Sequence, residues 1–258
     1  MAGLAGLVVL GCAEASAGAR PPEPPPRPPE FGGAKPVIVA PAPPAATPAP
    51  PATPSGAAAN GPASECRARL AGRGIVVETA AAPPATESAC LIEDPVRLVR
   101  VAVEGAPTVA VRFPEEPVIA CRFAEAFGGW IGGLVAPFLM GKLGTPLASV
   151  RTGPGFECRS RNRVAGGKPS AHGSGIAVDI AAFELSDKRV LSIKPGREAS
   201  TVPPATPSPG DEALATLRIA ACGWFTTVLG PGSDPYHSDH LHLDLQPHGP
   251  SDRYRICQ

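Results

Sequence analysis

The sequence lacks an excess of charge of either sign, and its main part lacks long hydrophobic runs. Its 23 basic residues balance 23 acidic residues, so it has none of the basic surplus with which proteins bind a phosphate backbone. Beyond the N-terminal segment, no stretch approaches the ~20 continuous apolar residues of a membrane span. We therefore expect neither nucleic acid as a partner nor a spanning helix in the main part of the chain.

The cysteines lack the C-x-x-C spacing that is typical of thiolate zinc sites and redox motifs. Of the seven cysteines, Cys12 lies near the N-terminus. The other six are scattered, and an even number in this arrangement predicts three disulfides formed in an oxidising compartment. They are Cys66, Cys90, Cys121, Cys158, Cys222 and Cys257. The spacing does not choose among their possible pairings.

The N-terminus has features of an export signal, predicted to cover residues 1–17. Leu4 to Leu10 is a short apolar run, and Ala15-Ser16-Ala17 fits an A-x-A cleavage pattern. No Lys or Arg precedes the run, which is a departure from that pattern. Because Cys12 follows a Val-Leu-Gly tripeptide, the segment also loosely resembles a lipoprotein processing site. We expect an exported protein of the periplasm or cell envelope, with a lipid anchor at Cys12 as the alternative to simple cleavage.

Residues 18–63 are expected to form a disordered, Pro/Ala-rich tether. Nearly half of the chain's 35 prolines fall between Pro21 and Pro62. Such a segment has too few large apolar side chains to offset its ordering entropy, and it acts as a stiff spacer. Binding to a partner or to the cell wall is the alternative use. The remainder, residues 64–258, is long enough for one domain with its own core.

The apolar pattern of residues 64–258 predicts an α+β domain. Helices are expected near residues 64–70, 116–143 and 211–224, the second of them broken or kinked at its glycines and Pro137. Strands are expected at residues 96–103, 109–113, 156–159, 175–183, 189–193 and 241–245, and a loop at 195–210. Helices mixed with short strands favour a small, mainly antiparallel sheet with flanking helices.

The placement of the five histidines is the strongest chemical signal in the chain. His237, His240 and His242 lie within six residues, and His172 opens a short segment that ends at Asp179. Either these histidines serve a metal, or they are ordinary polar groups on the surface. The hydrophobic residues around them favour the metal, because a polar face next to buried leucines must meet something other than the core.

Alternation places the polar residues of both segments on one side. In the run H-L-H-L-D-L, His240, His242 and Asp244 would share one face of a strand while the leucines share the other. In G-I-A-V-D-I, Asp179 lies on the face opposite its buried neighbours. Two adjacent strands would then present Asp179 and His242 side by side, with His172 approaching from the preceding turn.

Two imidazoles and one carboxylate are the composition of a catalytic zinc site, since they leave the fourth tetrahedral position for water. A structural site would be closed by four ligands, usually with thiolates. The metal would lower the pKa of a water towards ~7 and polarise a scissile carbonyl. Asp239 and His237 are near enough in sequence to move the protons. The same donors can also hold other divalent metals.

The motif S-x-H-x-x-G-x-A-x-D at residues 170–179, with D-H-x-H at 239–242, resembles the D-Ala-D-Ala carboxypeptidase branch of the lysostaphin- and hedgehog-like zinc peptidases. A longer match resembles the bacterial extensin-like C-terminal domain family more closely. It runs from Cys158-Arg159 through SAHGSGIAVDIAAFELSD to CGWFTTVLGPGSDPYHSDHLHLDL. The resemblance covers about residues 66–257, nearly all of the expected domain, and implies a zinc-peptidase core.

The resemblance implies a role for each matched residue. It makes His172, Asp179 and His242 the ligands of one zinc ion per chain. Asp239 corresponds to the catalytic base. His237 corresponds to a histidine that stabilises the developing oxyanion or assists proton transfer.

Two further residues take roles from the same resemblance. His240 corresponds to the first histidine of H-x-H, which belongs to the site without binding zinc. Arg159 lies where the peptidases place an arginine that engages a substrate carboxylate or carbonyl. Arg161 and Arg163 are nearby competitors, and Arg159 is preferred because a disulfide at Cys158 could fix it in place.

Other polar residues have more modest interpretations. Ser170 is expected to cap a turn rather than to act as a nucleophile, because no glycine elbow accompanies it. Asp244 either orients His242 or His172, or is a surface carboxylate. His248 is expected in an exposed loop. The long spacing between Asp179 and His242 predicts an insertion at residues 195–210, acting as a lid or as a block.

The leading functional hypothesis is an exported zinc peptidase that hydrolyses amide bonds in peptidoglycan stem peptides or cross-links. The metal-ligand set predicts metal-assisted hydrolysis, and the compartment supplies the substrate. One alternative is a cell-wall-binding module that retains the zinc but has lost turnover. Another is a structural envelope protein whose proline-rich arm is the functional part. The sequence does not decide between a carboxypeptidase and an endopeptidase, nor does it give the oligomeric state.

Overall fold

The computed structural model describes residues 62–82, 84, 90–194, 206–249 and 254–258. All of them belong to one compact unit, Ser55–Gln258. The predicted export signal with Cys12, all but the last two residues of the predicted tether, and most of the predicted loop at 195–210 lie outside the described residues.

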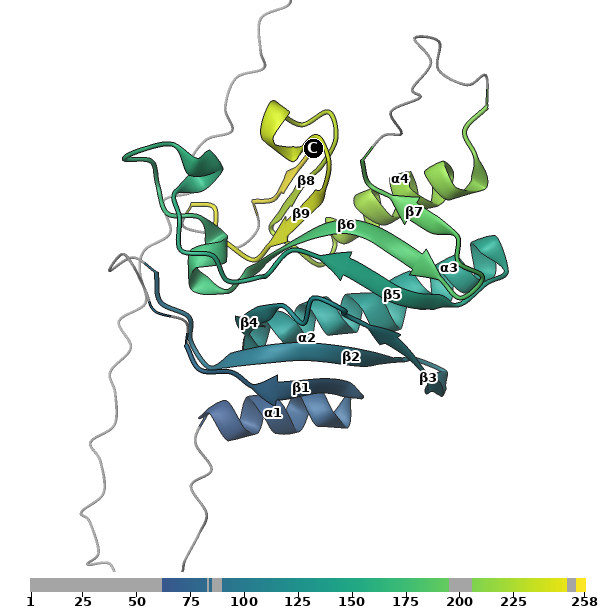
Figure 1. Ribbon diagram of the computed structural model, residues 1–258, viewed down its shortest axis with the longest axis horizontal. Helices are drawn as coiled ribbons and strands as arrows, with labels where there is room; N and C mark the ends of the chain where they lie inside the picture. The colour runs from purple at the N-terminus through teal and green to yellow at the C-terminus, as the bar shows by residue number, and fades with distance from the viewer. Residues whose placement is uncertain (1–61, 83, 85–89, 195–205, 250–253) are drawn as a thin grey trace, which may run out of the picture. The chain divides into compact units, whose positions relative to one another are not determined.

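A mixed ten-stranded sheet forms the centre of the unit, so the predicted α+β class is confirmed (Figure 1). Its order is β1-β2-β3-β5-β6-β9-β8-β10, with β4 beside β2 and β7 beside β6. The strands are β1 (Ile75–Thr79), β2 (Pro95–Val103), β3 (Ala106–Arg112), β4 (Val118–Ala120), β5 (Leu147–Thr152), β6 (Ala177–Leu185), β7 (Val190–Ser192), β8 (Thr227–Leu229), β9 (Leu241–Asp244) and β10 (Ile256–Cys257). Most pairs are antiparallel, as predicted, whereas β3–β5 and β8–β10 are parallel. The expectation of a small sheet was wrong, because short edge strands extend it.

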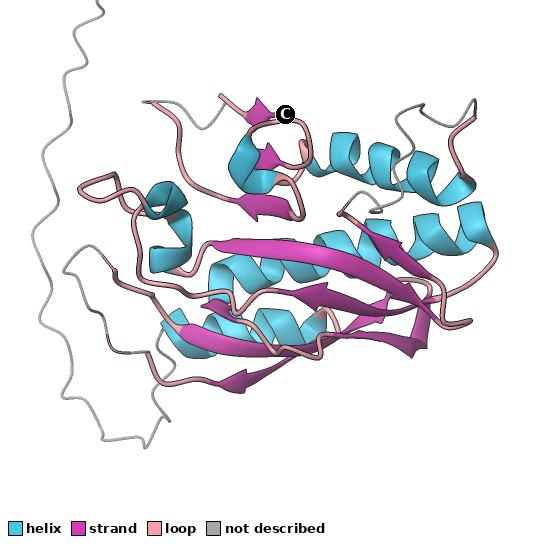
Figure 2. Ribbon diagram, turned by 45° about the horizontal axis from the view of Figure 1, so that its top comes forward, coloured by secondary structure: helices cyan, strands magenta, loops and turns pink. Residues whose placement is uncertain are grey.

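The helices pack beside one another against the sheet (Figure 2). They are α1 (Pro62–Gly72), α2 (Cys121–Trp130), α3 (Ala136–Leu143) and α4 (Pro209–Ala221). Helix α1 contacts α2 and β1, and α3 contacts α4 and β5. A capping box fixes the start of α4, where the side chains of Ser208 and Asp211 each bond the other's backbone N–H.

Aromatic side chains fill the space between α2 and the sheet. Phe113, Phe123, Phe127, Trp130 and Phe225 are all fully buried. The rings of Trp130 and Phe225 meet nearly edge to face at 5.5 Å, and those of Phe113 and Phe127 lie 5.6 Å apart. Offset and edge-to-face pairs of this kind stabilise a core beyond the area that they bury. This aromatic cluster belongs to the core on which the sheet packs, and the polar site lies on that sheet.

The predicted helix at residues 116–143 begins at Cys121 instead, because residues 118–120 pair with β2 as strand β4. The irregularity predicted at its glycines and Pro137 lies just before Pro137, the second residue of α3, in a stretch that contains Gly132 and Gly133. A π-helical turn, Ile131–Val135, joins α2 to α3. The run Cys121–Leu143 is long and apolar enough to cross a membrane, yet 56% of its most apolar window is buried inside the domain. It serves as the central helix of the core.

Residues 156–159 do not form the predicted strand. Phe156 N–H donates to Val118 O at 2.7 Å, whereas Glu157 N–H donates to His172 O at 3.3 Å. Consecutive residues thus bond to two different segments, and no ladder can form. The alternating hydrophobicity of this stretch reflects contacts on two sides of an irregular segment.

Three disulfides close the domain, as the cysteine count predicts. They join Cys66 to Cys121, Cys90 to Cys158, and Cys222 to Cys257. The first ties α1 to α2, the second ties two irregular segments together, and the third ties the end of α4 to β10. The pairings depend on the fold and could not be chosen from spacing.

The aromatic cluster predicts a sharp difference between two apolar-to-alanine changes. Phe127→Ala should lower the free energy of unfolding by about 3 to 5 kcal/mol, because it leaves a cavity in the closed core. Ile219→Ala removes a side chain that is 75% exposed, and should change stability by no more than ~0.5 kcal/mol. Urea denaturation of both variants checks this. Equal losses would contradict the assigned core.

Candidate metal centre

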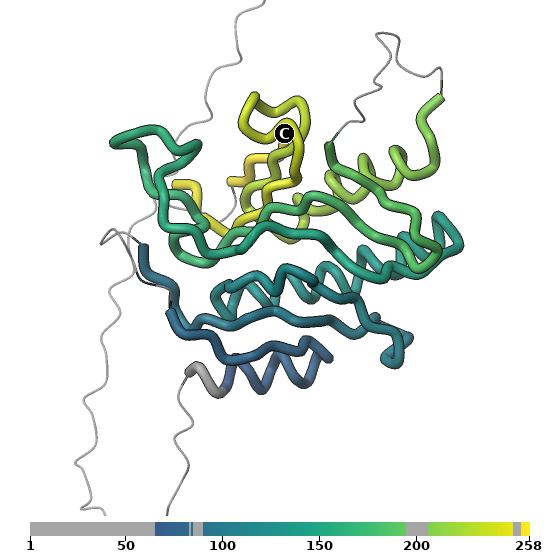
Figure 3. The backbone as a smooth tube through the Cα atoms, viewed as in Figure 1, coloured from purple at the N-terminus to yellow at the C-terminus, as the bar shows by residue number. Residues whose placement is uncertain are grey.

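Pairing between β6 and β9 brings the two halves of the polar site together. Asp179 in β6 lies directly opposite His242 in β9. The green and yellow segments that hold these strands are far apart in the sequence but run side by side (Figure 3). On the other side of β9, His242 lies opposite Leu229 in β8. Asp179, His242 and Leu229 therefore form a row across three adjacent strands. The adjacency of Asp179 and His242 that alternation predicts is present in the structure.

A bulge in β6 lets the same strand serve both the polar site and the core. The register with β5 shifts between Arg151 and Thr152, which face Ala182 and Ile180. The extra residue between these two reverses the alternation. Val178 and Ile180 are buried before the bulge, and Phe183 is buried after it. Asp179 thus points away from the helices while the rest of the strand keeps its apolar side on the core.

His172 comes from a short 3₁₀ turn, η3 (Ala171–Ser174), just before β6. Ser170 precedes the turn, and its hydroxyl accepts a hydrogen bond from the backbone N–H of His172 at 3.4 Å. Ser170 thus caps the turn, as predicted. Gly175 ends the turn at a φ of 64°, in the left-handed region that favours glycine. The G of the S-x-H-x-x-G motif is therefore required by the backbone that delivers His172 to the strand.

The three side chains converge on one point. His242 Nδ1 lies 2.8 Å from Asp179 Oδ1, His172 Nε2 lies 3.3 Å from the same oxygen, and the two ring nitrogens are 3.2 Å apart. Tetrahedral ligands at about 2.0 to 2.1 Å from zinc lie roughly 3.3 Å from one another. Two of the three separations match this spacing. The shortest one is a hydrogen bond between His242 and the carboxylate.

The remaining ring nitrogens of both histidines already have partners. His172 Nδ1 donates to Gly155 O at 2.7 Å, which leaves Nε2 with its lone pair toward the centre. His242 Nε2 donates to Asp244 Oδ2 at 3.0 Å. Metal-binding histidines generally use their second nitrogen in this way, because the partner fixes the tautomer and the ring orientation. The donor set therefore fits a divalent metal such as zinc.

Charge at the centre is compensated by a proton. Burial disfavours the charged form of His242, but hydrogen bonds to Asp179 and Asp244 outweigh it and raise the pKa of His242 to about 9. Burial likewise opposes ionisation of Asp179, yet its close contacts with the His172 and His242 rings hold the pKa of Asp179 far below its usual range. A partly buried carboxylate of this kind is stabilised by a nearby cation, and here the His242 imidazolium supplies it.

A second group of potential ligands lies elsewhere but cannot bind a metal in the same way. Cys66, Asp94 and Cys121 gather within ligand distance of one another. Their two sulfurs are bonded as a disulfide, so neither is available as a thiolate. Among the described residues, the centre formed by His172, Asp179 and His242 is the group with free donors.

The centre lies in an open cleft of about 500 Å³. One wall is the loop before β6, which carries Arg159, Arg161 and Arg163, and the other is the loop before β9, which carries Tyr236 and His237. Figure 1 shows both loops, teal and yellow, rising beside β6 and β9. The cleft is large enough for a peptide segment rather than a single small ion.

The three residues predicted to take part in catalysis, His237, Asp239 and His240, differ in exposure, and only the two histidines line the cleft. His237 is buried, and its Nδ1 lies 2.8 Å from both carboxylate oxygens of Asp234. His240 Nε2 is 3.6 Å from Asp179 Oδ1, and its Nδ1 is 3.0 Å from Asp239 Oδ1. The Asp239 side chain is 54% exposed and lies behind His240. His240, rather than Asp239, thus presents a nitrogen to the centre.

All three arginines named from the sequence line the cleft, but their partners differ. Arg159 and Arg163 both pair with the carboxylate of Glu157, Arg159 through Nε at 2.7 Å. Arg161 Nη2 donates to the neutral amide of Gln246 at 2.6 Å. No carboxylate among the described residues pairs with Arg161, so its charge is available to a ligand and it is a stronger candidate than Arg159.

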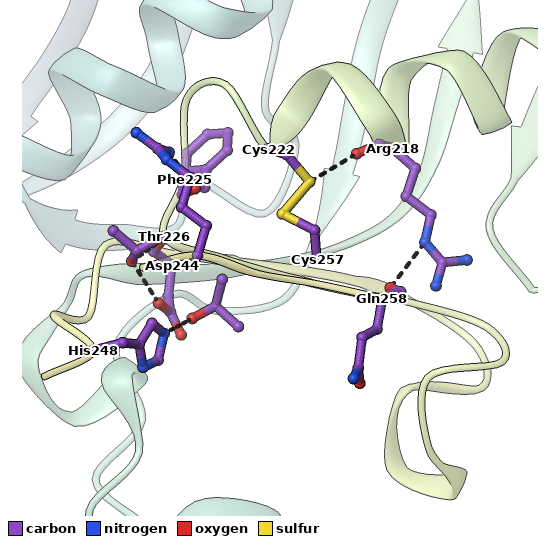
Figure 4. The surroundings of a disulfide bond; sticks show 10 residues. Arg218, Cys222, Phe225, Thr226, Asp244, His248, Cys257 and Gln258 are labelled. Carbon is purple, nitrogen blue, oxygen red and sulfur yellow. Dashed lines mark hydrogen bonds between the residues drawn. A yellow bond between two sulfur atoms is a disulfide. The ribbon is translucent and has the colours of Figure 1, made fainter. Parts of the chain in front are cut away.

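Asp244 and His248 are more closely tied to the site than the sequence indicated. Asp244 is 4% exposed, and besides His242 it accepts hydrogen bonds from Gln246 N and Thr226 Oγ1. His248 was expected to be exposed, but it is half-buried, lines the cleft, and lies 2.8 Å from Thr227 Oγ1. Figure 4 shows Asp244, Thr226 and His248 together near the disulfide that holds β10. Asp244 thus orients His242 and is no surface carboxylate.

Comparison with known proteins finds one family match, and all residues of the centre lie within the matched segment. A family model described as extensin-like protein C-terminus matches residues 64–258. The chain belongs to this family. No curated protein and no solved structure matches it. The likeness to the extensin-like family that the sequence motifs suggested is confirmed, while the relation to zinc peptidases stays a prediction.

Several residues of the extensin-like domain support the centre without having been found from the sequence. Gly155 acts through its carbonyl, so its side-chain type gives no signal. Asp234 and Glu157 act through local contacts within their own loops, and Gln246 acts through a contact with the distant Arg161. Asp234 alone could have been found, because D-P-Y-H places a capping carboxylate three residues before His237.

The protonated state of His242 predicts that metal binding depends on pH. Its raised pKa keeps it protonated below about 9, and a metal at Nδ1 must displace that proton. The apparent zinc affinity should therefore rise about tenfold per pH unit from pH 7 to 8 and level off above 9. Chelator-competition titrations in buffered zinc measure it.

Asp244→Asn supplies the matched control for this pH dependence. It removes one of the two carboxylates that raise the pKa of His242, so the affinity should level off at a lower pH. The plateau itself should fall by about 10- to 100-fold, because the ring loses its anionic partner. A wild-type affinity that is flat between pH 7 and 9 would show that the metal binds elsewhere.

Proposed function

We propose that this chain is an exported, zinc-dependent peptidase that hydrolyses amide bonds in peptidoglycan stem peptides or cross-links. The observation that carries the proposal is the convergence of His172 Nε2, His242 Nδ1 and Asp179 Oδ1 within 3.3 Å of one another. Each histidine uses its other nitrogen on an oxygen of the protein. An open cleft surrounds them, as a catalytic site requires and a purely structural site does not.

His172, Asp179 and His242 would hold the metal. Zinc bound there would supply Lewis acidity, which lowers the pKa of a water and polarises a scissile carbonyl. The three residues carry one formal negative charge between them, so a site with zinc would stay cationic. Such a site favours the build-up of negative charge on the carbonyl oxygen during attack.

Proton transfer would fall to the pair formed by Asp239 and His240. His240 Nε2 faces the centre, and the Asp239 carboxylate holds its Nδ1. In this arrangement His240 accepts the proton of the attacking water and Asp239 stabilises the imidazolium that forms. His237, oriented by Asp234, would place its Nε2 beside the developing oxyanion. The sequence motif alone would give Asp239 the role of base.

The arginine wall of the cleft favours a substrate with a carboxylate. Arg161 retains its charge beside a neutral partner, at a rim where a peptide's carboxyl group can reach it. Arg159 and Arg163 share the single carboxylate of Glu157, so this wall as a whole is cationic. Stem peptides of peptidoglycan carry free carboxylates, and their bonds are amides. A carboxypeptidase reaction fits this wall best, and the open cleft also admits cross-linked strands.

Disulfides favour the same compartment as the predicted export signal. Three of them close the domain, and such bonds persist in oxidising compartments. In the bacterial envelope, peptidoglycan is the abundant peptide polymer within reach of a tethered domain. The location and the site chemistry therefore point to one substrate.

Variants of the proton-transfer pair test the proposed chemistry on purified peptidoglycan. His240→Gln should lower kcat by about 100-fold or more, because it removes the group facing the water. Asp239→Asn should lower it as well, and both variants should keep wild-type zinc content. Muropeptide analysis by mass spectrometry identifies the products. Asp187→Asn, an exposed carboxylate in the turn after β6, is the control that should leave activity unchanged.

The same assay separates the competing functions. Stoichiometric zinc with no product from the wild type would favour a cell-wall-binding module that has lost turnover. Absence of zinc from the wild type would favour an envelope protein with a structural role. A larger loss in Asp239→Asn than in His240→Gln would return the role of base to Asp239.

Arg161→Gln tests the substrate wall. It should raise KM for peptides with a free carboxylate by about 10-fold or more, with a smaller change in kcat, because a charge-assisted hydrogen bond is lost. Arg163→Gln is the matched control, since that guanidinium is already engaged by Glu157. Equal effects of both changes would show that the wall acts only through its overall charge.

A further inference from the structure

The Cys90–Cys158 disulfide lies directly beside the turn that carries His172. Cys158 is part of the irregular segment Gly155–Arg159, and Cys90 is buried. A Cβ atom added at Gly173 would come within 3.1 Å of Cys90 Sγ. The sulfur therefore packs against the residue that follows His172 in the chain.

The segment Gly155–Arg159 bonds to the His172 turn at alternate residues. Gly155 O accepts from His172 Nδ1 at 2.7 Å, Glu157 N–H donates to His172 O at 3.3 Å, and Ser170 N–H donates to Arg159 O at 3.0 Å. Cys158 lies between the last two of these contacts. Whatever fixes Cys158 therefore also fixes the groups that set the ring and backbone of His172.

The turn also rests on the segment that contains Cys90. A Cβ atom added at Gly175 would meet Ile92 Cδ1 at 2.4 Å, so the turn lies flat on Ile92. Ala120 N–H also donates to Gly175 O at 2.8 Å. The turn is thus held between two segments, and the Cys90–Cys158 bond joins them covalently.

We propose that the Cys90–Cys158 disulfide is a positioning element of the metal centre, holding His172 Nε2 where Asp179 and His242 converge. The inference rests on the proposed metal site. Asp179 and His242 stand on paired strands, whose ladder fixes them without help. His172 has no such support, because its neighbours at Gly155–Arg159 are irregular. Without the bond, this segment gains freedom, and the ring loses the acceptor that selects its tautomer.

The same disulfide also affects the arginine wall of the cleft, because Glu157 is the residue before Cys158. Glu157 pairs with both Arg159 and Arg163. A fixed Cys158 therefore holds both His172 and the arginine wall in place. Formation of this disulfide would complete the site only after the chain has reached an oxidising compartment.

Two double variants of the full chain test the proposal. Cys90→Ala/Cys158→Ala removes the positioning bond, and Cys66→Ala/Cys121→Ala removes a bond between α1 and α2. The pairs span 68 and 55 residues, so their loop-closure effects on stability are similar. Zinc affinity is measured by chelator competition, the His172 tautomer by ¹⁵N NMR of the imidazole, and Tm by calorimetry.

The first pair should lose about 10-fold or more in zinc affinity, and its His172 ring should exchange between tautomers. The control pair should keep its affinity within about twofold and its tautomer fixed, although its Tm falls by a similar amount. Equal losses in both pairs, or none in either, would overturn the positioning role. A wild type without zinc would refute the proposed function, and the NMR arm would still decide whether the bond holds His172.

Gly173→Ala tests the positioning role of the disulfide if the Cys90→Ala/Cys158→Ala variant fails to fold. It keeps the disulfide but presses a methyl group against Cys90 Sγ, and should lower zinc affinity by roughly threefold or more. Gly141→Ala, where an added Cβ has no neighbour within 4 Å, is the control and should leave affinity unchanged. An unchanged affinity in Gly173→Ala would contradict the proposal.

Discussion

The register between β6 and β9 is the constraint on which the site depends. Because the strands are antiparallel and Asp179 lies opposite His242, a carboxylate and an imidazole meet on the face away from the helices. A slip of β9 by one residue would turn His242 into the core and a leucine toward Asp179. The buried leucines of β9 and Val178 of β6 prevent that slip, since they occupy the other face. Hydrophobic burial thus sets the position of the polar chemistry, and the aromatic layer on α2 holds the sheet in place.

The ligands are supported in two different ways. Asp179 and His242 belong to the sheet, and Asp244, on the same strand as His242, keeps that ring in one orientation. His172 belongs to an irregular turn and depends on Gly155 O and on the contacts around Cys158. A site assembled in this manner has two rigid donors and one that is completed by loop structure. The loop before β6 also carries the arginines, so ligand geometry and substrate contacts are coupled through short stretches of backbone.

Much of this could be predicted from the sequence, because alternation is a property of single strands. Period-two hydrophobicity located β6 and β9, and it placed Asp179 and His242 side by side. Features that depend on contacts between distant segments were not accessible. The bulge that reverses β6, the irregular path of residues 156–159 and the disulfide pairings all follow from packing. The sequence also could not show that Arg161, and not Arg159, is left without a carboxylate among the described residues. Glu157 has several arginines close by in the sequence, and Gln246 reaches Arg161 only in the folded chain.

The central claim is that His172, Asp179 and His242 form one metal centre. The most direct measurement is a crystal structure of the zinc-loaded protein, with diffraction data collected on both sides of the zinc absorption edge. We predict one strong anomalous peak per chain, within bonding distance of His172 Nε2, His242 Nδ1 and a carboxylate oxygen of Asp179. A peak on other residues, or none at this centre under saturating zinc, would contradict the account.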